Sequence, residues 1–242
     1  MSTPILKKIH SLCLCLLFIQ PIFALSNKSS HNLLIINSYN EQAAWSNSII
    51  VPIMQEVGKM SNTSAYVSHL HSILIKNDSL YQHSVNTLFQ RYENTKPHSV
   101  VLIGNMAFTL RDRIKEEWGD IPIILCAGRD SYTSPRYNYP EYESAEIPKD
   151  SIFSISGLKD KYNFTFILCP TYCKETIDMM MKIQPGIKTF IFAADKLFIN
   201  RIHKKEIKSY LSSSYPNIEY KRIYPNSNPA VPNLRKYLLT NE

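Results

Sequence analysis

The chain of 242 residues contains six glycines, 14 prolines and 15 tyrosines, and its formal net charge is +7. The glycines lie too far apart to form a G-x-G-x-x-G dinucleotide turn, a phosphate-binding P-loop or a G-x-S-x-G nucleophile elbow. The zinc motif H-E-x-x-H is also missing from the sequence. We therefore expect a protein that is not an enzyme and that holds no cofactor, although an acid-base site assembled from distant residues stays open.

The N-terminus has the pattern of an export signal. Lys7 and Lys8 precede an apolar run from Leu12 to Phe23, and the sequence Ala-Leu-Ser at 24–26 offers small residues to a signal peptidase. The apolar run is too short for an ordinary membrane span of about 20 residues. We expect a signal peptide at 1–26 and a location in the periplasm or on the extracytoplasmic face of the inner membrane. An uncleaved anchor is the alternative.

The mature chain is mildly basic. Removing 1–26 takes away two lysines and no acidic residue, so the formal charge of +7 becomes +5. Basic residues concentrate between 196 and 208, where Arg201, Lys204, Lys205 and Lys208 can share the polar side of one amphipathic helix. No aromatic residues interleave with these charges, and an exported protein does not meet DNA. We interpret this stretch as a solvated helix face and expect no nucleic-acid partner.

Short apolar runs alternate with amphipathic segments over the first part of the mature chain. This alternation is typical of βαβ units and a parallel sheet, and it predicts a first α/β lobe over 27–128. The predicted strands are 33–37, 66–71, 100–103 and 121–126, and the predicted helices are 45–60, 78–92 and 107–118. Asp78 is the expected cap of the second helix.

The alternation breaks over 129–156, a segment with three prolines, and then resumes. We interpret 129–156 as a crossover or an irregular surface excursion. The region 157–242 reads as a second lobe of which only two strand-helix units are present. Its predicted helices are 174–184, 197–210 and one that begins near Pro232, and its predicted strands are 189–193 and 218–224.

Five sequence stretches resemble the ABC transporter substrate-binding protein-like family. They are LLIINSYN followed by Trp45, SVVLIGNMAF, IPIILCAG, ISGLKD and QPGIKTFIFAAD, and their order and spacing extend the likeness from about residue 31 to 224. The resemblance implies an α/β fold with two Rossmann-like lobes of the type I periplasmic binding protein kind, the second lobe incomplete. It also implies a small-molecule cleft between the lobes.

That family occurs as free binding proteins and as the extracytoplasmic sensor domain of bacterial histidine kinases, including hybrid kinases. The resemblance therefore implies a small-molecule-binding sensor input domain, which we expect to be an N-terminal fragment of a two-component sensor histidine kinase. The alternative is a free periplasmic solute-binding protein of an ABC transporter. The expected partners are a small molecule of unknown class and a membrane-embedded kinase or permease, and a homodimer is left open.

Ligands of open parallel sheets bind beyond the carboxyl ends of the strands, because backbone amides and helix N-termini point there. The residues that we predict to bind the ligand are Ser38, Tyr39, Trp45, Asn105, Ala127, Gly128 and Asp195. Tyr39 and Trp45 would supply aromatic walls, and Asn105 and Asp195 would supply directional hydrogen bonds. The alternative roles are structural: helix caps for Ser38, Asn105 and Asp195, and a place in the core for Trp45.

Histidine and cysteine spacing gives no metal site. His69 and His71 fall two apart on a predicted strand, but no third ligand follows at a characteristic spacing. Three cysteines, Cys126, Cys169 and Cys173, remain after the signal, so at least one thiol stays free or pairs with another chain. A bridge between Cys169 and Cys173 is left open, because Pro170 makes its geometry uncertain.

Overall fold

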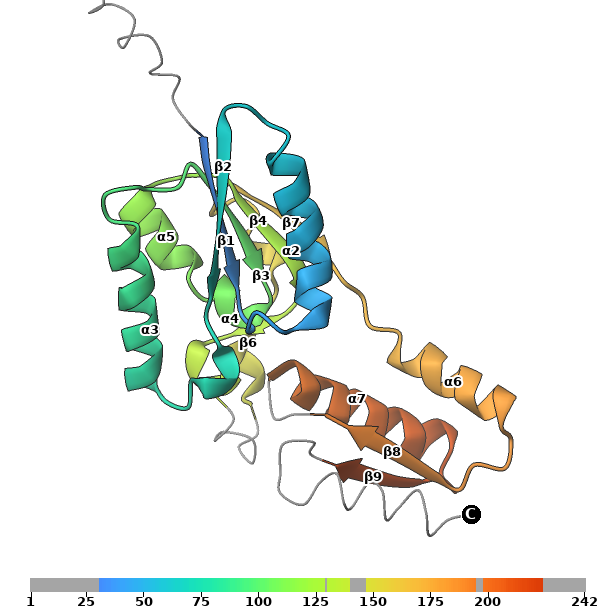
Figure 1. Cartoon of the computed structure of the whole chain (residues 1–242). Helices are drawn as coiled ribbons and strands as arrows, with labels where there is room; N and C mark the ends of the chain where they lie inside the picture. The colour runs from blue at the N-terminus through green and yellow to red at the C-terminus, as the bar shows by residue number, and fades with distance from the viewer. Residues whose placement is uncertain (1–30, 129, 140–146, 195–197, 224–242) are drawn as a thin grey trace, which may run out of the picture.

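The computed structural model describes residues 31–128, 130–139, 147–194 and 198–223. These residues form two α/β bodies joined by a long connection, as Figure 1 shows. The larger body contains a five-stranded sheet, and the smaller one contains a two-stranded sheet. The predicted signal peptide at 1–26 and the predicted helix from Pro232 lie outside the described residues.

The five-stranded sheet is entirely parallel, with strand order β2-β1-β3-β4-β7. Its strands are β1 (His31–Asn37), β2 (Thr63–His69), β3 (Ser99–Ile103), β4 (Ile123–Gly128) and β7 (Phe164–Leu168). The central strands read as continuous apolar runs because helices cover both of their faces. Asn37 pairs with His69 on one side and with Ile103 on the other. The turns that follow β1, β2 and β3 therefore meet at one edge of the sheet.

Helices on opposite faces of the sheet bury the two side-chain sets of each strand. Ile35 packs with Ile50 of α2 (Ala44–Val57) on one face. Leu34 packs on the other face with α3 (Asp78–Arg91) and α5 (Arg111–Trp118). Alternate strand residues point to opposite faces, which explains this division. Figure 1 shows α2 on one side of the sheet and α3 with α5 on the other.

Two details of the first lobe differ from the sequence prediction. The helix expected at 107–118 is split into the four-residue α4 (Asn105–Phe108) and α5. Asn77, rather than Asp78, caps α3, because its side chain accepts a hydrogen bond from Leu80 N at 2.9 Å. Asp78 instead is the first helical residue and accepts a hydrogen bond from the Tyr139 hydroxyl at 2.9 Å.

The segment 129–156 is not a surface excursion along its described length. It contains an antiparallel ribbon of β5 (Tyr132–Thr133) and β6 (Ile152–Phe153), with the 3-10 turns η3 (Pro135–Asn138) and η5 (Lys149–Ser151). Tyr132, Tyr139 and Ile155 are buried in the core of the first lobe. Buried tyrosines of a segment that suggested a loop therefore close one end of this core. The turn η6 (Ser156–Leu158) follows.

Strand β7 is not predicted by the sequence pattern and lies beyond the predicted end of the first lobe at residue 128. It pairs in parallel with β4, so the first sheet draws on residues that the sequence prediction placed in the second lobe. As an edge strand it has one covered face: Phe164 and Phe166 pack against the core, whereas Ile167 is 61% exposed. This short run alternates like a half-buried strand, a pattern too brief to stand out.

The second lobe is built from α6 (Cys173–Ile183), β8 (Thr189–Ala193), α7 (Phe198–Ser214) and β9 (Glu219–Ile223). Its two strands are parallel, and its own core contains Ile177, Phe190, Ile207 and Leu211. The predicted solvated face of α7 is correct for Lys205 and Lys208, which are exposed, but Arg201 is buried at 8% exposure. No helix among the described residues is both long and apolar enough to span a membrane.

Candidate functional site

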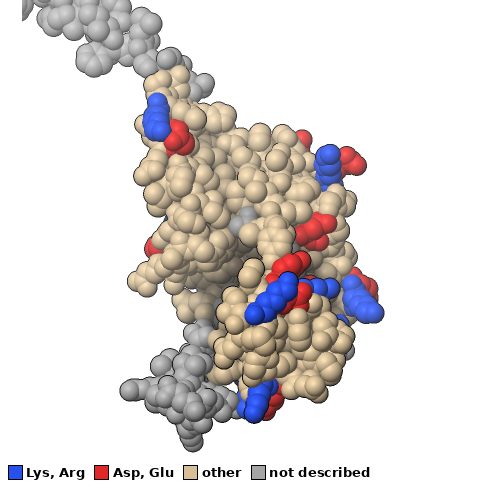
Figure 2. Space-filling view, turned by 90° about the vertical axis from the view of Figure 1, so that its right-hand side faces the viewer, with Lys and Arg blue, Asp and Glu red and all other residues tan. Residues whose placement is uncertain are grey.

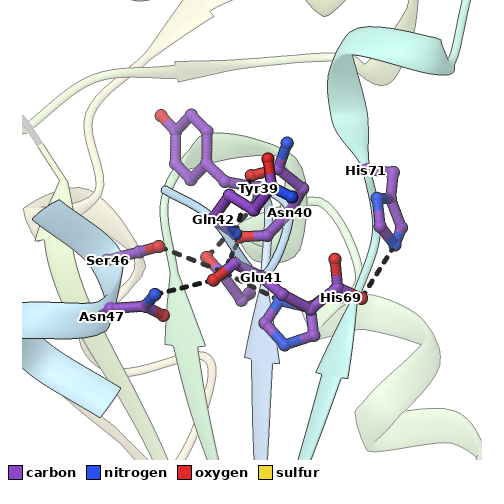
Figure 3. A network of polar contacts seen from close by, with 9 residues as sticks. Tyr39, Asn40, Glu41, Gln42, Ser46, Asn47, His69 and His71 are labelled. Carbon is purple, nitrogen blue, oxygen red and sulfur yellow. Dashed lines mark hydrogen bonds and ion pairs between the residues drawn. The ribbon is translucent and has the colours of Figure 1, made fainter. Parts of the chain in front are cut away.

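A polar network fixes the turn that follows β1, and Figure 3 shows its members. Asn37 is completely buried, and its Oδ1 accepts a hydrogen bond from Tyr39 N at 3.3 Å. Its Nδ2 donates to Ser46 Oγ at 3.2 Å and lies 3.1 Å from His69 Nδ1. One amide side chain thus connects the ends of β1 and β2 with the first turn of α2.

The contact between Asn37 and His69 also bears on the tautomer of His69. Because Asn37 Oδ1 accepts the backbone N–H of Tyr39, Asn37 Nδ2 must be the atom that faces His69. An amide nitrogen only donates hydrogen bonds, so His69 Nδ1 must accept, and the ring proton must be on Nε2.

Ser38 joins the first turn to the third strand and its helix. Its backbone N donates to Ile103 O at 2.9 Å, and its Oγ accepts from Ala107 N at 2.9 Å. The hydroxyl therefore satisfies one of the free amides in the first turn of α4. Gly104 permits this approach, because a Cβ there would lie 2.9 Å from both Ser38 Oγ and Tyr39 Cε2.

These turns form one wall of a narrow crevice between the two lobes, with a cavity volume of about 20 Å³. Figure 2 shows the molecule turned by 90° from Figure 1, with a hollow between its two halves. Ser38, Tyr39, Ser72, Asn105 and Met106 line the crevice from the first lobe. Asn138 contributes from η3, and Phe198 with Ile199 contributes from the start of α7 in the second lobe. The crevice therefore opens at the carboxyl ends of the parallel strands.

Glu41 and His71 lie opposite each other on the turn beside this wall. His71 Nε2 lies 3.4 Å from Glu41 Oε1, and both side chains are partly exposed. A hydrogen bond with its own backbone lowers the pKa of the Glu41 carboxyl, and the charges of His71 and His69 lower that pKa further. Glu41 therefore loses its proton more readily than an ordinary glutamate, and its carboxyl lies opposite the His71 ring.

The structure brings three of the predicted ligand-binding residues together, since Ser38, Tyr39 and Asn105 all line the crevice. Trp45 lies outside the lining, is 41% exposed, and packs edge-on against Tyr39 with ring centroids 4.9 Å apart. It neither fills the core nor lines the crevice, and instead supports the Tyr39 ring.

The remaining predicted site residues have different outcomes. Ala127 and Gly128 end β4, and their side chains are not among those that the structure describes. Asp195 lies outside the described residues. A structural role is found for Ser38, because its hydroxyl accepts a hydrogen bond from Ala107 N in α4. Its side chain also lines the crevice, and its ligand role stays a prediction.

Sequence reasoning missed Ser72, Asn138 and Phe198. Ser72 follows β2 just as Ser38 follows β1, so the rule that selected Ser38 could have selected it. The predicted second strand ended two residues late, at His71 instead of His69, so the turn after β2 was not recognised. Asn138 and Phe198 reach the crevice through long-range folding, for which no local signal exists.

The two neighbouring histidines do not converge with a third ligand. His69 and His71 have ring centroids 6.2 Å apart, and the described residues contain no group of three His, Cys, Asp or Glu side chains placed to hold a metal ion. Cys126, Cys169 and Cys173 form no disulfide with one another. The bridge between Cys169 and Cys173 that the sequence left open is therefore not formed in this structure.

No protein-family model matches the chain, and no curated protein matches it in sequence. Solved structures do match in fold. A protein assigned to the LacI transcriptional regulators, from Bacteroides fragilis, aligns with a TM-score of 0.54 at 11% identity over 87% of this chain and 67% of that chain. A conserved domain protein from Vibrio cholerae aligns with a TM-score of 0.51 at 10% identity, over 86% of this chain and 62% of that chain.

An uncharacterized protein from Actinobacillus succinogenes aligns equally well, with a TM-score of 0.51 at 10% identity over 88% of this chain and 64% of that chain. The chain thus spans between 62% and 67% of the lengths of these three similar chains. The fold is a two-lobed α/β architecture like that of the protein assigned to the LacI regulators. This likeness establishes the fold class.

Proposed function

We propose that the chain is an extracytoplasmic small-molecule-binding domain that serves as the sensor input of a histidine kinase. The observation that carries the proposal is the crevice, whose walls come from the carboxyl ends of β1 and β3 and from the start of α7. In open α/β sheets this edge is where ligands bind. The two lobes have separate cores, so a ligand that touches both can favour one arrangement of the lobes.

A thermal-shift screen of a metabolite library tests the binding role. A ligand present at 100 times its Kd adds about 2.7 kcal/mol to the free energy of unfolding, which raises Tm by roughly 5–10 °C for a protein of this size. We expect Asn105→Ala to reduce this shift, because Asn105 lines the crevice. Asn62→Ala is the matched control, since Asn62 is exposed just before the first residue of β2. A library without any stabilising compound would refute the binding role.

Export and the sensor role need separate experiments. Export predicts that the mature protein isolated from its own host begins at Asn27, and N-terminal sequencing that finds Met1 would contradict it. The DNA that follows codon 242 separates the two proposed contexts. A membrane span followed by kinase domains supports the sensor, whereas an early stop codon beside permease genes supports a transporter-binding protein. The resemblance of the sequence to the sensor family favours the first.

A further inference from the structure

A groove on the outer edge of the first lobe is larger than the crevice between the lobes. Its cavity volume is about 420 Å³, whereas the crevice, at about 20 Å³, has room for about one water molecule. One side of the groove is the end of β2, an edge strand of the sheet, and the other side is α3 (Figure 1). Ligand pockets usually measure roughly 300–1,000 Å³. The groove therefore has room for a small organic molecule.

The floor of the groove is apolar. Leu70, Ile75 and Leu88 line it and are buried. Leu74 and Leu80 line it as well, and they are 64% and 42% exposed, so the apolar surface continues from the floor onto the rims. A molecule that covers these side chains removes their apolar surface from water, which favours binding. The floor thus suits a ligand with an apolar body.

One side of α3 adds polar groups to the groove. His83, Thr87 and Arg91 are spaced four residues apart, so they lie along one stripe of the helix, with Ser84 beside it. Within the described residues, the hydroxyls of Ser84 and Thr87 make no hydrogen bond, and the Arg91 guanidinium makes neither a hydrogen bond nor an ion pair. Arg91 in the last turn also favours the helix dipole, but this leaves its N–H donors unused.

Strand β2 contributes a further donor. His69 lines the groove, and its Nδ1 lies 3.1 Å from Asn37 Nδ2. Because Nδ1 accepts from that amide, the ring proton is on Nε2. His69 Nε2 has no hydrogen-bond partner in the part of the chain that the structure describes. The two sides of the groove therefore both offer N–H donors.

The formal charge of the lining is positive. Among the described residues that line the groove, Arg91 alone carries a formal charge when histidine is counted as neutral. Its end of α3 lies beside Ser68, because Ser68 Oγ is 3.2 Å from the Tyr92 hydroxyl. The acidic Glu41 lies near the other end, where its Oε1 is 3.4 Å from His71 Nε2. His71 follows Ser68 by three residues, or about 10 Å of extended chain. An anion is therefore favoured at the Arg91 end.

We propose that this groove binds a small organic anion whose carboxylate contacts Arg91 and whose apolar body covers the leucines of the floor. A hydrogen bond between a guanidinium and a carboxylate is roughly twice as strong as one between neutral groups, so the carboxylate orients the ligand. The groove and the crevice share no lining residue. The groove is thus a second site, and it does not depend on the function proposed for the crevice.

Calorimetric titration of the full chain with matched compounds tests the ligand class. The probes are 3-phenylpropionate and octanoate, their uncharged amides, and acetate, which has a carboxylate without a large apolar body. We expect at least one of the larger carboxylates to bind about tenfold more tightly than its amide and than acetate. Amides that bind as tightly as the carboxylates would overturn the preference for an anion. An absence of binding by both larger carboxylates would overturn the site.

Arg91→Gln locates the carboxylate. Arg91 is exposed and has no side-chain partner to lose in the described part of the chain, so the variant is expected to fold. It should weaken carboxylate binding about tenfold and leave amide binding unchanged, because only the carboxylate uses the charge. Leu74→Ser should weaken the binding of both compounds about threefold, because Leu74 would contact the apolar body. Lys208→Gln removes a positive charge from an exposed position of α7 and should affect neither compound.

The groove and the crevice fail separately in these experiments. If Asn105→Ala abolishes carboxylate binding and Arg91→Gln does not, the compound binds in the crevice and the groove proposal is wrong. If Arg91→Gln and Lys208→Gln weaken binding equally, the net charge of the protein explains the effect, and the proposal is wrong as well. Neither result removes the function proposed for the crevice, which the metabolite screen tests.

Discussion

Replacing Gly104 by alanine tests whether close packing between β3 and the turn after β1 builds the crevice wall. Gly104 has φ +83° and ψ 171°, a backbone conformation that is nearly restricted to glycine. An added Cβ would lie 2.9 Å from Ser38 Oγ and 2.9 Å from Tyr39 Cε2. Because Ser38 and Tyr39 both line the crevice, the substitution must displace the wall itself.

The expected loss in the free energy of unfolding has two parts. Holding alanine in this backbone conformation costs about 1–3 kcal/mol, and crowding a packed site costs about 1–3 kcal/mol more. We therefore expect Gly104→Ala to lower the free energy of unfolding by about 2–6 kcal/mol. Gly119 is the matched control: its φ is +87° and its ψ −164°, but a Cβ there would meet nothing within 4 Å. Gly119→Ala should lose only the backbone part, about 1–3 kcal/mol.

Urea denaturation and ligand titration together give the decisive measurement. Both variants should unfold at lower urea than the unchanged protein, and Gly104→Ala should lose more stability. Ligand affinity should fall only in Gly104→Ala, because Gly119 ends α5 away from the lining residues. Equal losses of stability in the two variants, or an unchanged affinity in Gly104→Ala, would refute this account of the wall.

Three other outcomes follow from contacts elsewhere in the chain. The hydroxyls of Tyr210 and Tyr215 lower the pKa of Asp178, and the hydrogen bond to Asp178 raises the pKa of Tyr215 to about 12. The hydrogen bonds to Asp178 therefore stabilise the fold at pH values above the ordinary aspartate pKa. This stabilisation is lost as the pH falls through the lowered pKa of Asp178. Asp178→Asn should accordingly lower the urea midpoint at pH 7 but not near pH 2, and an equal loss at both would contradict the linkage. Nitrogen NMR of His69 should show the proton on Nε2, and a protonated Nδ1 at neutral pH would show that Asn37 does not donate to it. Burial raises the pKa of the Cys126 thiol, so iodoacetamide at pH 8 should alkylate it only in urea, and mass spectrometry that finds rapid native labelling would contradict its burial.

The parallel core of the first lobe could be predicted because its strands carry the signal themselves. The run Leu33 to Ile36 is continuously apolar, as a strand covered on both faces must be, and it forms β1 with Leu34, Ile35 and Ile36 fully buried. The rule that side chains at the carboxyl ends of parallel strands share one edge worked for the same reason. Ser38 and Asn105 each follow one of these strongly marked strands, so the carboxyl-end rule alone is enough to place both on the same edge of the sheet.

The parts that could not be predicted depend on contacts between distant segments. Tyr139 lies in a proline-rich stretch that looks like a loop, but it is fully buried because its hydroxyl reaches Asp78, 61 residues away in sequence. β7 is a half-buried edge strand of five residues, so its alternating apolar pattern is too short to indicate a strand. Phe198 begins a helix in the second lobe, and no local feature of the sequence shows that this end of α7 faces the first lobe.

The two walls of the crevice differ in how firmly they are held, and this difference bears on the proposed function. The first-lobe wall is fixed by the buried Asn37 and by Ser38, whose bonds tie β1 to α2, β2 and α4. The second-lobe wall belongs to α7, whose core around Ile207 is separate from the core of the first lobe. Relative motion is the default for lobes with independent cores. Under the proposed function, a ligand would meet one preorganised wall and one that can move, and its contacts with Phe198 and Ile199 would change the population of lobe arrangements. Affinity and signal would then be separable, because the first-lobe residues proposed to bind are not those that would report closure.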